Sequence, residues 1–305
     1  MLRLAAALLL ALPSGPVLHE FDIPTKNAGP VGIAAGPDGT VWFTEETGDR
    51  IGRLAPDGTM TQFKLPVGAQ PAGIVAGPDG ALWFADMGLN AIGRITTDGH
   101  VTEFKLRTIT PKPASITVGP DGALWFTERA RARIGRITTS GQVREFQLPL
   151  LRDVYGIAAG RDGNLWFTEV RNGIVGRITT AGHFREFHTS PGAGPGGIVA
   201  GADGALWFTE VYLGRIGRIT TGGKLTEFRL PANLAYPNLI TAGRDGALWF
   251  TETRADAIGR ITTNGKVTSY EVPTGQAAPV AITDAGGTIY GTEYAANRIF
   301  ELAER

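Results

Sequence analysis

The sequence contains no cysteine, only four histidines and three methionines, and no excess of either charge. Without cysteine the chain can form neither a disulfide framework nor a cysteine-linked lipid anchor. The 29 basic residues match the 29 acidic residues in number, which argues against a nucleic acid or an anionic membrane recognised by bulk charge. The repeated part of the chain also lacks a helical period of 3.6 residues, so we expect strands rather than helices there.

A continuous apolar run at the start of the chain stands apart from the rest. Residues 4–12 form this run of nine, after Arg3 and before a Pro-Ser-Gly-Pro stretch. The run is too short to span a bilayer and is typical of a secretory signal peptide. We therefore expect residues 1–16 to be a signal peptide, a secreted or periplasmic location, and no membrane span. An ordinary apolar terminal segment is the alternative.

The main part of the chain is built from seven copies of one stretch, seen in residues 206–210 as Leu-Trp-Phe-Thr-Glu. The aromatic residues that lead the copies are spaced 41 or 42 residues apart: Trp42, Trp83, Trp125, Trp166, Trp207, Trp249 and Tyr290. A fixed period of about 40 residues is the signature of a repeat architecture.

Each repeat has the pattern of four short strands joined by hairpin turns. In the fifth copy the predicted strands are 197–201, 206–209, 216–220 and 225–230, with Asp203-Gly204 and Gly222-Gly223 as turns. Pro231 ends the repeat because it cannot donate to a ladder. The sequence therefore predicts an all-β protein, a seven-bladed β-propeller of four-stranded blades, as a single domain over residues 17–305.

The two ends of the domain complement each other. Residues 18–24 match the fourth-strand pattern, and residues 298–302 match the third-strand pattern, so the seventh repeat lacks its own outer strand. We expect the N-terminal strand to complete the last blade and close the ring, which removes an exposed edge. A closed ring needs no partner chain, and we expect a monomer.

An arginine recurs in the third strand of the repeats. With Asp98-Gly99 as a two-residue loop, Arg94 would face Glu103, and the same count pairs Arg136 with Glu145, Arg177 with Glu186 and Arg218 with Glu227. Opposite charges across a ladder stabilise it by a few tenths to about 1 kcal/mol each. We therefore interpret the arginine as a structural brace.

We call the face that carries the loops between strands two and three the top. Each repeat places two positions of interest there, one whose residue varies between repeats and one that is always acidic. The first, the slot, follows a proline in six of the seven blades: Val31, Ala72, Ala114, Tyr155, Gly196, Asn238 and Val280. The second ends each second strand: Glu45, Asp86, Glu128, Glu169, Glu210, Glu252 and Glu293. If these acids point to the axis, their mutual repulsion raises their pKa values or requires a cation. If they do not, they pair with arginines or cap loop amides.

The top loops are also rich in tyrosine and arginine, among them Arg129 and Arg171. Aromatic rings supply contact area, and arginines bind carboxylates or phosphates. We expect this face to bind a small molecule or a peptide through Tyr155, Tyr236, Asn238 and Tyr294. A solvated rim without a ligand is the alternative.

The repeat resembles that of the virginiamycin B lyase family, the streptogramin lyase propellers. The similarity is carried by Gly-Ala-Leu-Trp-Phe-Thr-Glu at 204–210, Arg-Ile-Gly-Arg-Ile-Thr-Thr at 215–221 and Leu-Thr-Glu-Phe-Arg-Leu-Pro at 225–231, and it extends over residues 18–302. The resemblance implies a ring-opening elimination that breaks an ester in a cyclic peptide antibiotic, with a base and a magnesium ion.

The residues that the resemblance assigns to this reaction are mostly absent. The family places histidines in the slots of blades six and seven, where this chain has Asn238 and Val280, and a metal-binding glutamate where it has Ala278. Glu293 matches the second metal ligand and is the tentative ligand for Mg²⁺. The four histidines of this chain lie on predicted outer strands or after turns of the opposite face.

Two interpretations remain open. The first is an exported propeller that has lost the lyase base and binds a small molecule, peptide or cell-envelope partner on its top face. The second is a metal-dependent lyase, or a lactonase-type enzyme, in which a carboxylate such as Glu252 or Glu293 acts as a relocated base.

Overall fold

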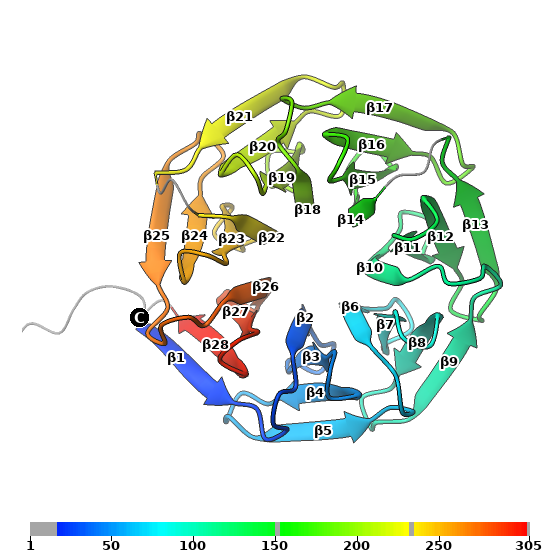
Figure 1. Cartoon of the computed structure of the whole chain (residues 1–305), viewed down its shortest axis with the longest axis vertical. Helices are drawn as coiled ribbons and strands as arrows, with labels where there is room; N and C mark the ends of the chain where they lie inside the picture. Colours follow the sequence, from blue (N-terminus) through cyan, green and yellow to red (C-terminus); the bar gives the residue numbers. More distant parts are fainter. Residues whose placement is uncertain (1–16, 150–152, 232–234, 304–305) are drawn as a thin grey trace, which may run out of the picture.

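The computed structural model describes residues 17–149, 153–231 and 235–303, and the expected signal peptide lies outside them. Seven four-stranded antiparallel sheets surround a central opening, as Figure 1 shows. The described residues form strands and turns and contain no α-helix. They therefore contain no helix that is long and apolar enough to cross a membrane. The prediction of an all-β, seven-bladed propeller is confirmed.

Each sheet, or blade, runs from an innermost to an outermost strand. The innermost strands are β2 (Pro30–Ala35), β6 (Pro71–Ala76), β10 (Pro113–Val118), β14 (Val154–Ala159), β18 (Pro195–Ala200), β22 (Pro237–Ala242) and β26 (Pro279–Ala285). The second strands are β3 (Val41–Glu45), β7 (Leu82–Asp86), β11 (Leu124–Glu128), β15 (Leu165–Glu169), β19 (Leu206–Glu210), β23 (Leu248–Glu252) and β27 (Thr288–Glu293). The third strands are β4 (Arg50–Leu54), β8 (Ala91–Ile95), β12 (Arg133–Ile137), β16 (Ile174–Ile178), β20 (Arg215–Ile219), β24 (Ala257–Ile261) and β28 (Arg298–Ala303). The outermost strands are β5 (Met60–Lys64), β9 (Val101–Lys105), β13 (Val143–Gln147), β17 (Phe184–His188), β21 (Leu225–Arg229), β25 (Val267–Glu271) and β1 (Val17–Asp22).

The ring closes as the sequence predicts. Strand β1 pairs antiparallel with β28, which makes it the outermost strand of blade seven. Asn297 reinforces this junction, because its side-chain amide donates to the carbonyl oxygens of Ile23 and Thr25 at 3.2 and 2.9 Å, while its oxygen accepts from the Ala28 amide at 2.7 Å. The chain is thus joined to itself through both main-chain and side-chain hydrogen bonds.

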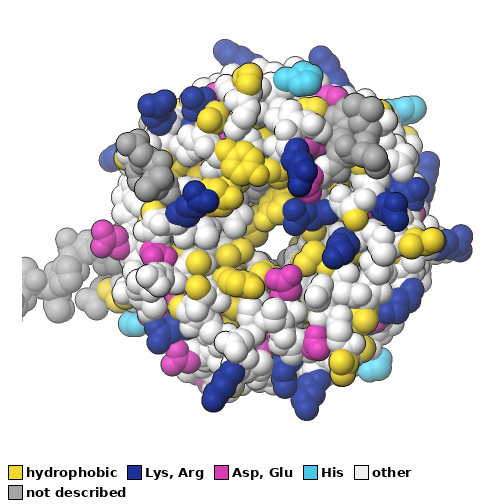
Figure 2. All heavy atoms as spheres, viewed as in Figure 1, with side chains coloured by type: hydrophobic (Ala, Val, Ile, Leu, Met, Phe, Trp, Pro, Cys, Tyr) yellow, Lys and Arg dark blue, Asp and Glu magenta, His cyan; other side chains and the backbone are white. Residues whose placement is uncertain are grey.

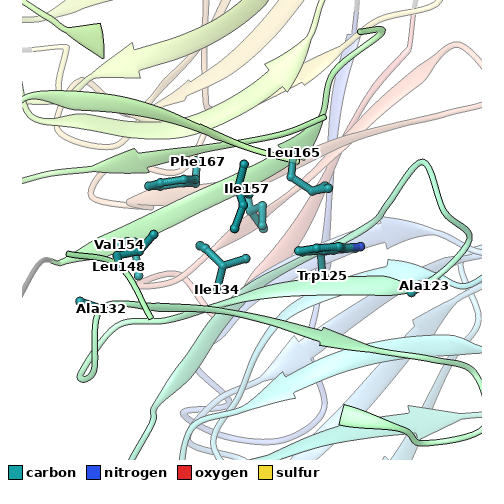
Figure 3. Packing of buried hydrophobic residues seen from close by; sticks show 10 residues of the cluster. Ala123, Trp125, Ala132, Ile134, Leu148, Val154, Ile157, Leu165 and Phe167 are labelled. Atoms are coloured by element: carbon teal, nitrogen blue, oxygen red, sulfur yellow. The ribbon is translucent and has the colours of Figure 1, made fainter. Parts of the chain in front are cut away.

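The hydrophobic core lies between neighbouring blades. Figure 3 shows the contact between blades three and four, where Trp125 and Ile134 of one blade face Ile157, Leu165 and Phe167 of the other. Similar clusters of buried residues recur around the ring. Since every blade buries one face against each neighbour, no blade has a complete core by itself.

The third-strand arginine is a brace, but the predicted partner is wrong. Arg94 faces Thr102, and Glu103 faces Gly93, because the hairpin has a three-residue loop with Gly99 in the left-handed region at φ 95°. The same shift of one residue separates the other predicted pairs. The Arg94 Nε instead contacts Asp79 Oδ2 at 2.7 Å, from the turn between the first two strands.

This aspartate joins three parts of a blade. In blade five, Asp203 accepts hydrogen bonds from the Trp207 indole at 3.0 Å, from the Ala205 amide at 3.2 Å and from Arg218 at 2.7 Å. Arginine–aspartate pairs of this kind occur in blades one to six. Blade seven has no such pair among the described residues, and its Tyr290 hydroxyl donates to Glu301 at 3.0 Å instead.

We predict that Asp203→Ala lowers the free energy of unfolding by about 1–3 kcal/mol, because it leaves a buried indole N–H without an acceptor. Urea denaturation measures the change. Asp57→Ala is the matched control, since Asp57 lies in an exposed outer turn and accepts from the backbone amide and side chain of Thr59 rather than from a buried indole. Equal stability of the two variants would contradict this role for Asp203.

Candidate functional site

A cavity of about 350 Å³ lies on the axis of the ring and is lined by the innermost strand of every blade. Figure 2 shows the opening in the centre of the molecule, with hydrophobic side chains around it. One isoleucine from each blade contributes to the wall: Ile33, Ile74, Ile116, Ile157, Ile198, Ile240 and Ile282. The wall is therefore mostly apolar, and its polar groups are few.

A bulge at the start of each innermost strand positions the slot residue. In blade one the pairing shifts between Pro30 and Ile33, so one extra residue lies opposite the second strand. Proline fits the first position because it has no N–H to donate. Bulges commonly redirect side chains beside binding sites. Five of the slot residues line the axial cavity: Val31, Ala72, Ala114, Tyr155 and Val280.

A buried threonine joins the innermost strands of neighbouring blades at five junctions of the described ring, whereas blade two has Ala85 in its place. The Thr44 hydroxyl accepts from the Gly32 amide and donates to the Ala72 carbonyl of blade two, both at 2.8 Å. The slot carbonyls of Tyr155, Gly196, Asn238 and Val280 are bound in the same way by threonines of the preceding blades. The backbone of the slot is thereby fixed while its side chain is free to vary.

Two of the four predicted ligand-binding residues meet beside the axial cavity, whose described lining includes Tyr155 but not Asn238. The Tyr155 hydroxyl donates to the Asn238 Oδ1 at 3.3 Å, which connects blade four to blade six. Blade five lies between them, and its slot residue is Gly196. Burial raises the pKa of the Tyr155 hydroxyl, so Tyr155 is a neutral hydrogen-bond donor.

The other two predicted residues lie on the rim and do not line the axial cavity. Tyr236 is stacked under the Arg254 guanidinium at 4.3 Å, and its ring centroid lies 6.4 Å from that of Tyr212. Tyr294 is 42% exposed. These tyrosines extend the top face outward from the cavity rather than forming its wall.

Three residues of the wall come from the loop that follows the second strand. Glu46, Met87 and Arg129 line the axial cavity, and each comes directly after the acid that ends its strand. Burial raises the pKa of Glu46, and the positive charge of Arg129 opposes the rise. The sequence analysis placed Arg129 on the rim but missed Glu46 and Met87. Their position after the strand-ending acid was the signal that could have found them.

The seven strand-ending acids do not point into the axial cavity. All are buried, and none belongs to its described lining. Asp86 accepts from the amides of Gln70 and Leu89 at 3.1 and 2.9 Å, and Glu45 accepts from Gln62 at 2.7 Å. Of the two expectations for these acids, the structure therefore favours local pairing and amide capping over a ring of charges that points to the axis.

Three of these acids face a second carboxyl group. Burial raises the pKa of Glu128 to about 8, and the neighbouring Glu145 adds to the rise. The same two causes raise the pKa of Glu210 to about 8 beside Glu227, and the pKa of Glu293 to about 8 beside Glu20. The Glu128 oxygens have no donor among the described residues, so a proton shared with Glu145 would satisfy both groups.

The residues at the magnesium positions of the family do not fit the ion. Glu293 is fully buried against Glu20 and Arg298, and Ala278 offers no side-chain ligand. The Ala278 amide donates to Asp256 at 3.0 Å, which occupies that carboxylate. Within residues 17–149, 153–231 and 235–303, no cluster of three histidine, aspartate or glutamate side chains could hold a metal. Glu252, the other candidate base, is also buried away from the axial cavity.

Comparison with known proteins identifies the relatives of this chain. The sequence model described as the virginiamycin B lyase family matches residues 12–153 and 151–304. The chain belongs to the virginiamycin B lyase family. Over the whole ring, it is similar to the crystal structure of virginiamycin B lyase from Staphylococcus aureus, with a TM-score of 0.91 and 40% identity, covering 94% of this chain and 99% of that one.

Further virginiamycin B lyases show the same relationship. A catalytically inactive histidine-to-alanine variant of the S. aureus enzyme, solved with quinupristin, matches with the same TM-score of 0.91 and 40% identity. The Bordetella parapertussis virginiamycin B lyase is 43% identical over 49 residues, which span 16% of this chain and 16% of that protein. The fold shared with the S. aureus enzyme covers 94% of this chain. In the slots of blades six and seven, this chain has Asn238 and Val280.

The buried carboxyl pairs predict how stability changes with pH. Below pH 4.5 these glutamates are protonated in both states, but between pH 4.5 and about 8 only the folded chain keeps the proton. The unfolded state then binds fewer protons, so stability falls as pH rises through this window and levels off above it. We predict that Glu128→Gln raises the melting temperature at about pH 9 by several degrees and has little effect at about pH 4.

The chain supplies its own matched variant for this test. Blade one has Gln62 where blade three has Glu145, so Glu145→Gln copies the arrangement of Glu45 and Gln62 into blade three. One pKa unit corresponds to about 1.4 kcal/mol, and Glu145→Gln should also flatten the pH dependence. Scanning calorimetry across the pH range measures it. An unchanged pH profile in both variants would show that the pair does not share a proton.

Proposed function

We propose that this member of the virginiamycin B lyase family binds a small molecule or peptide on its top face without opening a cyclic ester. The observation that carries the proposal is the hydrogen bond between Tyr155 and Asn238 at the mouth of the axial cavity. It engages one of the two slots in which the family resemblance expects a histidine base. Tyr236 and Tyr294 provide further aromatic contacts on the rim.

The chemistry of the slot residues supports binding over elimination. The reaction needs a group that removes a proton beside a carbonyl. Valine has no such group, and the asparagine amide has no basic atom near neutral pH. The cavity itself suits a ligand, since its volume of about 350 Å³ falls within the usual range for small-molecule sites.

A second candidate function is an enzyme with a relocated base. Glu46 favours it, because this carboxyl group lines the axial cavity and burial raises its pKa above the usual value, while Arg129 opposes the rise. A base with a pKa near the working pH is the most effective. Glu46, rather than the buried Glu252 or Glu293, is the carboxylate with access to a ligand in the cavity.

We also infer that the protein is exported, with residues 1–16 as its signal peptide. The inference is supported by the apolar run at 4–12. The lack of cysteine is compatible with export, since ring closure supplies the constraint that disulfides would otherwise give.

The first experiment incubates the purified protein with quinupristin and magnesium and follows the ligand by chromatography and mass spectrometry. We predict an intact ring. Elimination would give a linear product of unchanged mass that separates on the column, whereas hydrolysis would add one water. Formation of the linear isomer would overturn the proposal. If the Glu46→Gln variant then formed no linear isomer, Glu46 would be identified as the relocated base.

The second experiment tests binding with a panel of short linear and cyclic peptides by thermal shift. A ligand that binds only the folded state at 100 times its Kd stabilises the protein by about 2.7 kcal/mol. We predict that a shift seen in the native protein is lost in the double variant Tyr155→Ala and Asn238→Ala. His100→Ala, beside an outer turn of the opposite face, is the control that should keep it. A shift that survives the double variant would place binding elsewhere.

A further inference from the structure

A second cavity of about 550 Å³ lies on the top face beside the axial one. We call it the basic alcove and define it by its lining: Met87, Lys112, Arg129, Ala130, Ala132, Asp153 and Arg171. These residues come from the top loops of blades two to four. In Figure 2 cationic side chains gather on one side of the central opening, over these blades.

The alcove and the axial cavity adjoin. Met87 and Arg129 line both of them, so a ligand that fills one can extend into the other. The two spaces differ in character. The axial cavity has the ring of seven isoleucines, whereas the alcove has most of its wall formed by charged side chains.

The positive charge of the alcove exceeds its negative charge. Three cations, Lys112, Arg129 and Arg171, accompany one carboxylate, Asp153. Arg129 Nε and Arg171 Nε contact the two oxygens of Asp153 at 3.2 and 3.7 Å. Since each guanidinium has five N–H donors, one contact leaves most of them free.

Lys112 has no partner for its charge. Its ammonium group makes no hydrogen bond or ion pair within the described part of the chain. The backbone at Lys112 is nevertheless well held, because its carbonyl oxygen accepts from the Arg129 amide at 3.2 Å. The two loops that carry these cations are therefore joined beside the alcove.

Arg129 is oriented before any ligand arrives. Its guanidinium lies 5.1 Å from the centre of the Tyr155 ring and also contacts Asp153. A side chain fixed on two sides loses little freedom on binding, which favours affinity. Arg171 is 82% exposed and can approach a ligand from the outer side of the alcove.

We propose that the basic alcove binds the carboxylate of a ligand whose apolar body enters the axial cavity. The ligand class is an amphipathic monocarboxylate, such as the C-terminal end of an apolar peptide. Arginine forks match carboxylate geometry and form the stronger, charge-assisted hydrogen bonds. Glu46 at the axial cavity repels a second anionic group, so one end of the ligand carries the negative charge. This inference rests on the proposed function and adds the chemistry of its ligand.

The test uses one peptide in two forms, N-acetyl-leucyl-phenylalanine with a free carboxylate and the same peptide as its amide. Isothermal titration measures both affinities with the full-length protein. We expect the acid to bind at least about tenfold more tightly than the amide, which corresponds to about 1.4 kcal/mol. The difference should shrink as salt is raised, because exposed charges are screened.

Substitutions in the alcove identify the responsible residues. Lys112→Gln and Arg171→Gln should each weaken binding of the acid about threefold to tenfold and leave the amide unchanged. Arg129 is left intact because its loss would also disturb Tyr155 and Asp153. Arg244→Gln is the control, since Arg244 is 73% exposed on a turn of the opposite face.

The outcomes separate this inference from the proposed function. If the acid and the amide bound with equal affinity, and the Tyr155 and Asn238 double variant bound neither peptide, the carboxylate site would be overturned. Binding on the top face would still stand. Absence of binding by the acid at millimolar concentration would also overturn the inference. Failure of the proposed function has a different readout, the linear isomer of quinupristin.

Discussion

The rim of the axial cavity depends on a hydrogen bond that crosses from one blade to the next at five junctions of the described ring. A buried threonine hydroxyl accepts from the bulged backbone of its own blade and donates to the slot carbonyl of the neighbour, as Thr44 does with Gly32 and Ala72. Because the hydroxyl is fully buried, losing either partner would leave an unsatisfied polar group. The contact thus sets the spacing of the blades at the rim of the axial cavity.

The same contact separates scaffold from chemistry. It binds main-chain atoms, so it places no demand on the slot side chain, which is valine in blade one, tyrosine in blade four and asparagine in blade six. A lyase site and a binding site can therefore be built on one unchanged ring. This explains how the chain keeps a TM-score of 0.91 to a virginiamycin B lyase while its slots in blades six and seven lack histidine.

Local pattern was enough to predict the blades, because each strand and turn is encoded within its own repeat. The Arg94 partner was predicted incorrectly because the loop also includes Thr97, which shifts the register by one residue. The acids such as Glu128 could not be placed from sequence alone, because whether a strand-end side chain turns inward depends on packing between blades. The Tyr155–Asn238 contact joins residues 83 positions apart in blades four and six, which no local pattern reveals.

The pairing of β1 with β28 also governs the order in which the molecule can be completed. Strand β1 precedes the other described strands along the chain and has its only ladder partner in β28, which follows them, so blade seven cannot form until β28 has been synthesised. Until then the ring has two open edges, and each presents an apolar face normally covered by a neighbouring blade. A chain of this kind is most vulnerable to aggregation and proteolysis during its synthesis, and it acquires its final resistance in a single late step.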